Sequence, residues 1–203
     1  MKTRKNKLIL LLAIAAIIVG VVFGILKMRS RSNAVALVSA SASGNNTEVA
    51  RLLTIGVPAS ASYSALQGLG AGEPSLVKKI PIIAAAERGH SQTIALLLQH
   101  GAAIDAVNEW GESALIVACR KNQYDAVKVL VGNGANVNIR CERGRTPLMW
   151  AVGYASPQVV SLLIKNKARG GVDSVGQSML DLASHRSEPE RQQILDLIAP
   201  NRK

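Results

Sequence analysis

The sequence predicts an all-α fold, a solenoid of about five helix-turn-helix repeats preceded by one N-terminal transmembrane helix. Three observations lead to this prediction. One pattern of small and apolar residues recurs at an interval of 33 residues, each copy contains signals for the start of a helix, and the chain opens with a basic segment before a long apolar run. A period of this length is typical of solenoids, in which each unit buries its apolar face against its neighbours.

The repeat is clearest between Asn108 and Ala135, because the following segment repeats the same residue types in the same register. Three successive copies agree without a gap, which makes a chance match improbable. The positions that agree are Gly111, Ser113, Leu115, Ala118, Val127, Leu130 and Ala135 in the middle copy, Gly144, Thr146, Leu148, Ala151, Val160, Leu163 and Ala168 in the next, and Ile80, Ile82, Ala85, Ile94, Leu97 and Ala102 in the one before.

One unit shows why each copy folds as two short helices. Thr146 is a good N-cap, and Pro147 follows at the first helical position, where its missing N–H removes no hydrogen bond. Val160 and Leu163 then lie on the apolar face of a second helix. Neither helix is long enough to be stable alone, so we expect each to pack against the neighbouring units.

The segment Thr146-Pro147-Leu148-Met149-Trp150-Ala151 resembles the Thr-Pro-Leu-His-x-Ala signature of the ankyrin family. Gly89-His90, Leu97-Leu98 and Gly101-Ala102 resemble the later paired residues of the same repeat. The resemblance covers residues 34–200. With its N-terminal apolar run, the chain resembles small, membrane-anchored ankyrin proteins of bacterial type. It implies repeats at approximately 34–57, 78–107, 108–140, 141–172 and 173–200.

The first seven residues are basic and precede an uninterrupted apolar run. Leu8 to Leu26 are nineteen apolar residues, which would span roughly 28 Å as a helix, close to the ~30 Å hydrocarbon core of a bilayer. We therefore predict a basic flank over 1–7 and a transmembrane anchor over 8–28. A cleaved signal peptide is the alternative, but the run does not end at a small-x-small cleavage site.

The basic residues around this run bear on its orientation. Four precede it, together with the amino terminus, and three follow closely, so the positive-inside rule leans towards an internal amino terminus. We expect a single-pass inner-membrane protein with its repeats in the periplasm. Gly20 and Gly24 form a Gly-x-x-x-Gly pair, which is either a face for weak dimerisation or the glycine common in membrane helices.

The net charge of +11 comes largely from the anchor flanks. Those flanks hold seven of the 24 basic residues and none of the 13 acidic ones, so residues 33–203 carry 17 basic and 13 acidic side chains, a net charge of +4. This is a mildly basic domain without the charge of a nucleic-acid binder, and we expect no nucleic-acid partner.

Residues 57–79 are longer than the connection at the equivalent place in the other repeats, and they are rich in alanine, serine and glycine. We predict a loop insertion here. Long loops in compact domains often carry function, so this one is either a binding loop or a passive insertion.

The reactive side chains do not form a catalytic or metal-binding pattern. Cys119 takes the place of a small core residue and Cys141 falls in a turn, so we expect no disulfide between them. The three histidines, His90, His100 and His185, have no metal-ligand spacing. We therefore predict that the protein is not an enzyme and needs no cofactor.

A protein-binding surface remains. In ankyrin proteins the loop tips and the exposed faces of the first helices line one concave groove, and the resemblance implies the same here. The partner is either a secreted protein that an exported chain binds, as an inhibitor or immunity protein would, or a cytoplasmic protein that a scaffold tethers to the membrane. The predicted binding residues are Glu109, Trp110, Glu112, Glu142, Arg143 and Arg145 at the loop tips and Glu87, Arg88, Arg120, Lys121 and Tyr154 on the first helices.

Overall fold

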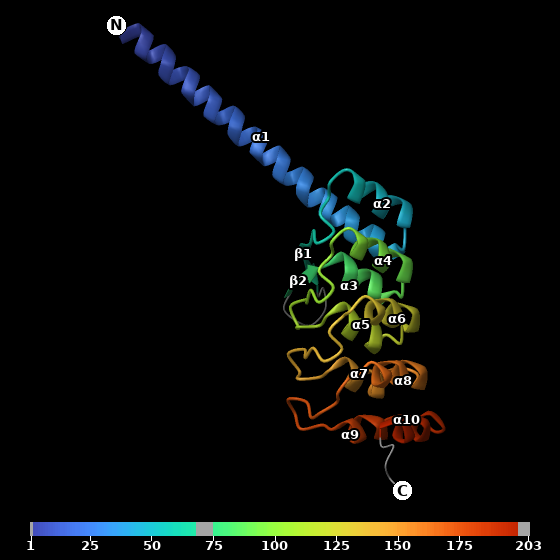
Figure 1. Ribbon diagram of the computed structural model, residues 1–203. Helices are drawn as coiled ribbons and strands as arrows, with labels where there is room; N and C mark the ends of the chain where they lie inside the picture. Colours follow the sequence, from blue (N-terminus) through green and yellow to red (C-terminus); the bar gives the residue numbers. More distant parts are fainter. Residues whose placement is uncertain (1, 68–74, 199–203) are drawn as a thin grey trace.

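The computed structural model describes residues 2–67 and 75–198, which form ten helices and two strands. The helices stack as antiparallel pairs, with α10 at the far end of the stack from the long first helix (Figure 1). The helices are α1 (Lys2–Ser43), α2 (Asn46–Thr54), α3 (Pro81–Glu87), α4 (Ser91–Gln99), α5 (Ala114–Arg120), α6 (Tyr124–Gly132), α7 (Pro147–Tyr154), α8 (Pro157–Lys165), α9 (Met179–Ser184) and α10 (Glu190–Ile198).

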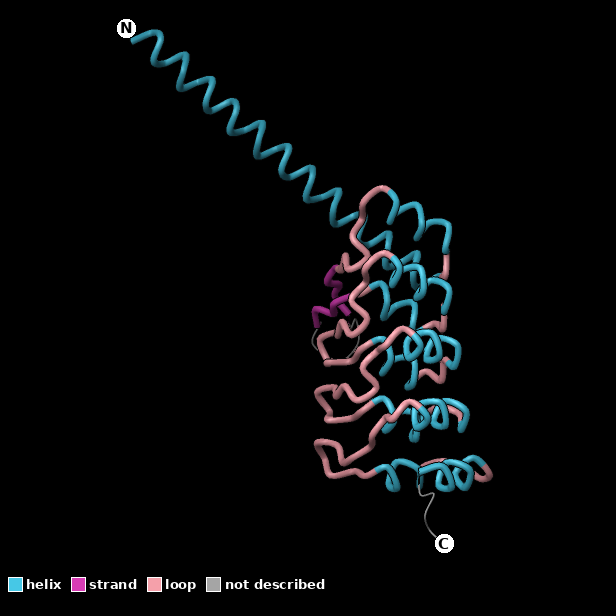
Figure 2. The backbone as a smooth tube through the Cα atoms, viewed as in Figure 1, coloured by secondary structure: helices cyan, strands magenta, loops and turns pink. Residues whose placement is uncertain are grey.

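Each repeat contributes one helix to each of two layers. The first helices α3, α5, α7 and α9 lie next to the loops, and the second helices α4, α6, α8 and α10 form the outer layer (Figure 2). Like helices of successive repeats pack on one another, as α5 does with α3 and α7. The result is one face of loops and first helices that runs along the stack.

The short first helices begin where the sequence supplies a hydroxyl cap. The side chains of Ser113 and Thr146 each accept a hydrogen bond, 3.3 Å long, from the backbone amide three residues on. Ser178 and Asp181 form a complete capping box at the start of α9. These caps satisfy amides that a helix of two turns leaves free, and they fix where each helix begins.

The core is a continuous apolar layer between the two rows of helices. Leu97, Leu130 and Leu163 occupy equivalent positions in the second helices of three successive repeats, and all three are fully buried. The alanines of the first helices at positions 85, 118 and 151 are also fully buried, which allows the neighbouring helices to approach closely. The 33-residue pattern is therefore the pattern of this core.

Helix α1 is continuous for 42 residues and ends as the first helix of the first repeat. Its last turns, which include the buried Leu37, pack against α2 and α3, whereas its amino-terminal part extends away from the stack (Figure 1). Within the described residues, no helix meets the length and hydropathy needed to cross a bilayer. The predicted anchor over 8–28 lies in α1, but the surroundings of most of its residues, including those of Gly20, are outside what the structure describes.

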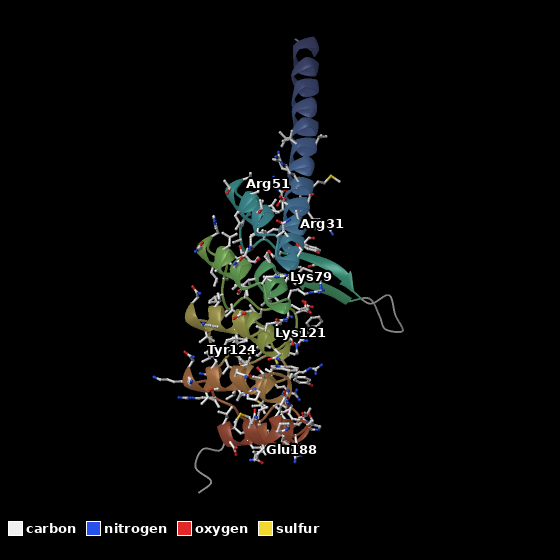
Figure 3. The ribbon with its side chains drawn as sticks, turned by 90° about the vertical axis from the view of Figure 1, so that its right-hand side faces the viewer. Arg31, Arg51, Lys79, Lys121, Tyr124 and Glu188 are labelled. Carbon is white, nitrogen blue, oxygen red and sulfur yellow. The ribbon has the colours of Figure 1, made fainter. Side chains whose placement is uncertain are left out.

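The segment predicted as a loop insertion contains a β-hairpin. Strands β1 (Tyr63–Gln67) and β2 (Ser75–Lys79) pair antiparallel, with Tyr63 opposite Lys79. Pairing gives the polar backbone of this long connection its hydrogen bonds, which an irregular loop would leave to solvent. The hairpin projects from the side of the stack, with Lys79 at its base (Figure 3). The backbone N–H of Lys78 donates to Glu109 Oε2 at 2.8 Å and so attaches the hairpin to the next loop.

Candidate protein-binding groove

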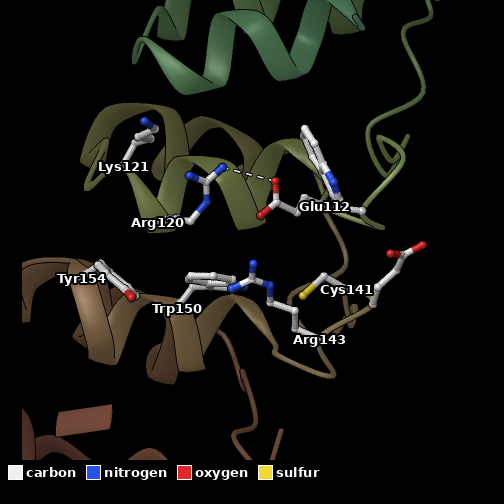
Figure 4. A pocket seen from close by; sticks show the side chains of 9 residues that line it. Glu112, Arg120, Lys121, Cys141, Arg143, Trp150 and Tyr154 are labelled. Atoms are coloured by element: carbon white, nitrogen blue, oxygen red, sulfur yellow. Dashed lines mark hydrogen bonds and ion pairs between the residues drawn. The ribbon is translucent and has the colours of Figure 1, made fainter. Parts of the chain in front are cut away.

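A hollow on the loop face lies between α5 and α7 and has a volume of about 520 Å³. Its walls come from two successive repeats, and Figure 4 shows their side chains facing one another across it. Seven of the residues predicted for binding line this cavity. The lining residues are Trp110, Glu112, Arg120, Lys121, Glu142, Arg143 and Tyr154, together with Cys141 and Trp150, which sequence reasoning did not place here.

Side-chain hydrogen bonds hold the loop tips in place. Asn108 Oδ1 accepts from the amides of Trp110 at 3.0 Å and Glu112 at 2.9 Å, and Asp173 closes the loop of the last repeat in the same way. In the repeat between them the equivalent position is Cys141, which has no amide or carboxylate oxygen. Its buried side chain instead lines the cavity.

Adjacent loop tips are joined through their backbones. The N–H of Glu142 donates to the carbonyl of Trp110, and the N–H of Ser174 donates to the carbonyl of Arg143, both at 3.0 Å. Trp110 and Arg143 hold equivalent places in these two loops, as the repeat predicts. Both side chains are exposed, Trp110 to 46% of its surface. Within the described residues, the guanidinium of Arg143 makes no hydrogen bond or ion pair.

Trp150 forms the floor of the cavity and is only 5% exposed. The Cζ atoms of Arg145 and Arg120 lie 4.9 Å and 5.8 Å from the centre of its ring, and the ring of Tyr154 is 5.5 Å away. The signature does not specify the residue at this position, so the sequence offered no reason to select it. The sequence did contain one signal for this position: the equivalent residue of the previous repeat is Val117, and Trp150 is much larger.

Glu112 and Arg120 form an ion pair across the upper wall. Arg120 Nη2 lies 3.2 Å from Glu112 Oε2, and the two side chains are 29% and 11% exposed. Glu112 was predicted as a binding residue at a loop tip, and it lines the cavity. The structure buries it because its carboxylate receives hydrogen bonds from Arg120 and Asn108.

Arg145 was also predicted as a binding residue at a loop tip, and the structure does not bring it to the surface. Its side chain is buried, with Nε donating to Asp173 Oδ2 at 2.8 Å and Nη2 donating to Gln177 Oε1 at 2.5 Å. Burial alone would raise the pKa of Asp173. The hydrogen bonds from Arg145 and from the amides of Gln177 and Val175 outweigh burial, and the pKa of Asp173 is held below its ordinary value. This pair joins the last two repeats instead of offering a free guanidinium.

A second hollow of about 290 Å³ adjoins the first and lies between α3, α5 and the base of the hairpin. Trp110, Glu112 and Arg120 line both hollows, so the two lie next to each other along the loop face of three repeats, and together they are called the groove here. Of the remaining predicted residues, Glu87 lines this second hollow and pairs with Lys121 at 3.5 Å, Glu109 binds the hairpin, and Arg88 lies exposed after α3 without lining either hollow.

The two cysteines and His90 lie in the packed interior or in contacts between repeats. Cys119 and Cys141 are both free and buried, and burial raises the pKa of the Cys119 thiol. His90 Nε2 lies 3.1 Å from the carbonyl of Ala42 and joins the first two repeats. In the part of the chain that the structure describes, no group of three potential metal ligands comes together.

Comparison with known proteins agrees with this architecture. A family profile described as "Ankyrin repeats (3 copies)" matches residues 37–141, and one described as "Ankyrin repeat" matches residues 143–171. The chain is 32% identical over 118 residues to Ankyrin repeat and SOCS box protein 16 of Homo sapiens, which covers 58% of this chain and 26% of that protein. It is 35% identical over 130 residues to Probable E3 ubiquitin-protein ligase XBOS33 of Oryza sativa subsp. japonica, covering 63% and 23% respectively.

The chain thus spans about a quarter of the length of these two relatives, and the similarity extends over the repeats. The first profile alone covers residues 37–141 of the 203, which is more than half of the chain. With the stacked helix pairs and the groove that they form, this coverage shows that the chain belongs to the ankyrin-repeat family, whose repeats act as protein–protein interaction modules.

Proposed function

We propose that this protein is a membrane-anchored interaction module that binds a partner protein in the groove formed by α3, α5, α7 and their loops. The observation that carries this proposal is that two neighbouring hollows on the loop face share Trp110, Glu112 and Arg120 in their walls. A groove that crosses three repeats is long enough for an extended segment or a helix of another protein.

The residues at the rim of the groove support the proposal. Trp110 and Arg143 are exposed, although the loop turns are already set by Gly111 and Gly144, whose φ angles are 69° and 72°. Exposed tryptophan and arginine are the residue types that dominate binding energy at protein interfaces. Neither side chain has another evident structural duty at this position.

The sequence of α1 supports attachment to the inner membrane. The apolar run from Leu8 to Leu26 is flanked by basic residues, and helix α1, which contains it, continues without a break into the first repeat. We infer that the repeats face the periplasm, where the protein would act as an inhibitor or immunity-type binder. A scaffold that faces the cytoplasm has the same groove and differs only in orientation.

The orientation is tested with an epitope added after Lys203. Protease treatment of spheroplasts should remove the epitope while the outer face of the membrane alone is accessible. If the epitope survives until the membrane is broken, the repeats face the cytoplasm, and the scaffold replaces the exported binder.

The groove is tested with the double variant Trp110→Ala and Arg143→Ala. Both side chains are exposed, so folding stability should change by less than about 1 kcal/mol. Affinity for a partner captured by the wild-type chain should fall at least about tenfold, or about 1.4 kcal/mol. The measurement is calorimetric titration of the purified partner.

A matched control is available on the outer layer. Tyr124 and Lys128 in α6 are also an exposed aromatic and an exposed cation, and they lie away from the groove. The variant Tyr124→Ala with Lys128→Ala should bind as the wild type does. If this control loses affinity and the groove variant keeps it, the partner binds the outer layer.

A further inference from the structure

Two N–H donors in the cavity wall have no acceptor among the described residues. They are Nε1 of the Trp150 indole and Nε of the Arg120 guanidinium, and both atoms are buried. Both residues line the cavity of about 520 Å³. Native proteins satisfy nearly all buried donors, so a pair of free donors beside one cavity indicates an acceptor supplied from outside.

The two side chains that carry these donors are neighbours. The Arg120 guanidinium lies 5.8 Å from the centre of the Trp150 ring, and its Nη2 is held by Glu112 at 3.2 Å. Figure 4 shows Arg120 and Trp150 on opposite walls, with Tyr154 on one side of them and Arg143 and Cys141 on the other. An acceptor group that enters between the walls would lie near both donors.

The charges around the cavity favour a negative group. Glu112 is paired with Arg120 and Glu87 is paired with Lys121, whereas Arg143 has no partner among the described residues. Glu142 of the lining is exposed, and its carboxylate also has no partner in the part of the chain that the structure describes. The buried part of the cavity therefore presents two N–H donors, and its mouth presents an unpaired cation.

We propose that this cavity binds a carboxylate, namely an aspartate or glutamate side chain on the bound segment of the partner protein. A carboxylate accepts hydrogen bonds at two oxygens and donates none, so it can receive both Trp150 Nε1–H and Arg120 Nε–H. The aromatic rings of Trp110 and Tyr154 then contact the apolar part of the same segment. This inference rests on the proposed groove and specifies the partner's chemistry.

The test uses the full chain in a mild detergent, with tryptophan labelled with ¹⁵N at the indole. Two indole signals are expected because the sequence contains two tryptophans, and Trp150→Phe identifies them. The probes are N-acetyl-glutamate methylamide and its uncharged glutamine counterpart. The glutamate probe should move the Trp150 signal more than the Trp110 signal, and it should bind at least fivefold more tightly than the glutamine probe.

Three variants locate the interaction. Trp150→Phe removes one donor and Arg120→Lys removes the other while keeping the charge, and each should weaken the glutamate probe at least fivefold. Glu142→Gln removes the rim carboxylate and should strengthen it. Tyr124→Phe on the outer layer should have no effect. Circular dichroism of each variant verifies that the helices are retained, and Arg120→Lys and Glu142→Gln remain decisive if Trp150→Phe does not fold.

Two results would overturn the inference. Equal affinity for the two probes would mean that the donors bind a neutral carbonyl. An unmoved Trp150 signal in the wild type would mean that the cavity binds neither. Loss of partner binding in the Trp110→Ala and Arg143→Ala variant would still uphold the proposed function, because that experiment requires the groove and not the carboxylate.

Discussion

Leu130 is the residue whose truncation should test the repeat architecture most directly. It is fully buried in α6, and α6 packs between α4 and α8 in the outer layer. Leu130→Ala removes about three methylene equivalents, each worth about 0.8 kcal/mol of transfer free energy, or about 2.4 kcal/mol in all. The cavity that remains adds to this cost, so the expected loss is about 2.5–5 kcal/mol.

The assay is urea unfolding of residues 33–203, followed by circular dichroism. Leu97→Ala and Leu163→Ala truncate the equivalent, fully buried positions of the repeats on either side. In a one-dimensional stack the central defect should separate the two ends and broaden the transition more than either flanking defect does. Lys128→Ala, exposed on the same helix, should change stability by less than about 0.5 kcal/mol.

A wild-type midpoint for Leu130→Ala would refute the packing described for α6. A loss equal in all three variants with no broadening would instead mean that the repeats unfold as a single unit. In that case the nearest-neighbour description of this stack would be wrong.

Two further predictions concern the loops. Gly144→Ala should lower the melting temperature more than Gly134→Ala. Both glycines have positive φ angles, 72° and 85°. A Cβ at Gly144 would lie 3.0 Å from the amide nitrogen of Ser174, whereas a Cβ at Gly134 would meet nothing within 4 Å. Gly134→Ala should therefore cost only the left-handed backbone penalty of about 1–2 kcal/mol, and an equal cost for both would show that the Ser174 contact yields without strain. The pKa of Asp173 is lowered in the folded state, so its carboxylate should stabilise the fold. This contribution to the free energy of unfolding should be complete above the unfolded pKa of about 4 and should be lost as pH falls through the lower folded pKa. The stability difference between the wild type and Asp173→Asn should thus shrink on acidification in urea titrations at successive pH values, and a constant difference would contradict the assignment.

The repeats could be predicted from the sequence because the core is periodic. Positions such as Leu130 and Ala118 reach the interior through local helix geometry, and the same residue types recur wherever the same neighbour packs against them. Trp110 and Arg143 were placed side by side by the same reasoning, since equivalent loop positions must be adjacent in a regular stack.

The features that were not predicted depend on contacts between repeats that have no period. Arg145 is buried because Asp173 and Gln177 lie in the next loop, and a sequence of charged and polar loop residues looks the same whether or not they pair. Trp150 lines the cavity together with Arg120 of the preceding repeat, a contact that the repeat pattern does not specify. The hairpin depends on pairing within an insertion that has no counterpart in the other repeats.

The unbroken course of α1 has a mechanical consequence for how the groove can meet a partner. A domain on a flexible tether samples every orientation within reach of its linker. Here the helix that would lie in the bilayer is also the first helix of the stack, so no flexible linker separates the anchor from the repeats. With residues 8–26 anchored as proposed, rotation about the helix axis and lateral diffusion would carry the groove along a ring at one height above the bilayer. A partner whose acidic segment is displayed at that height would be captured in two dimensions, and one held nearer or farther would be missed.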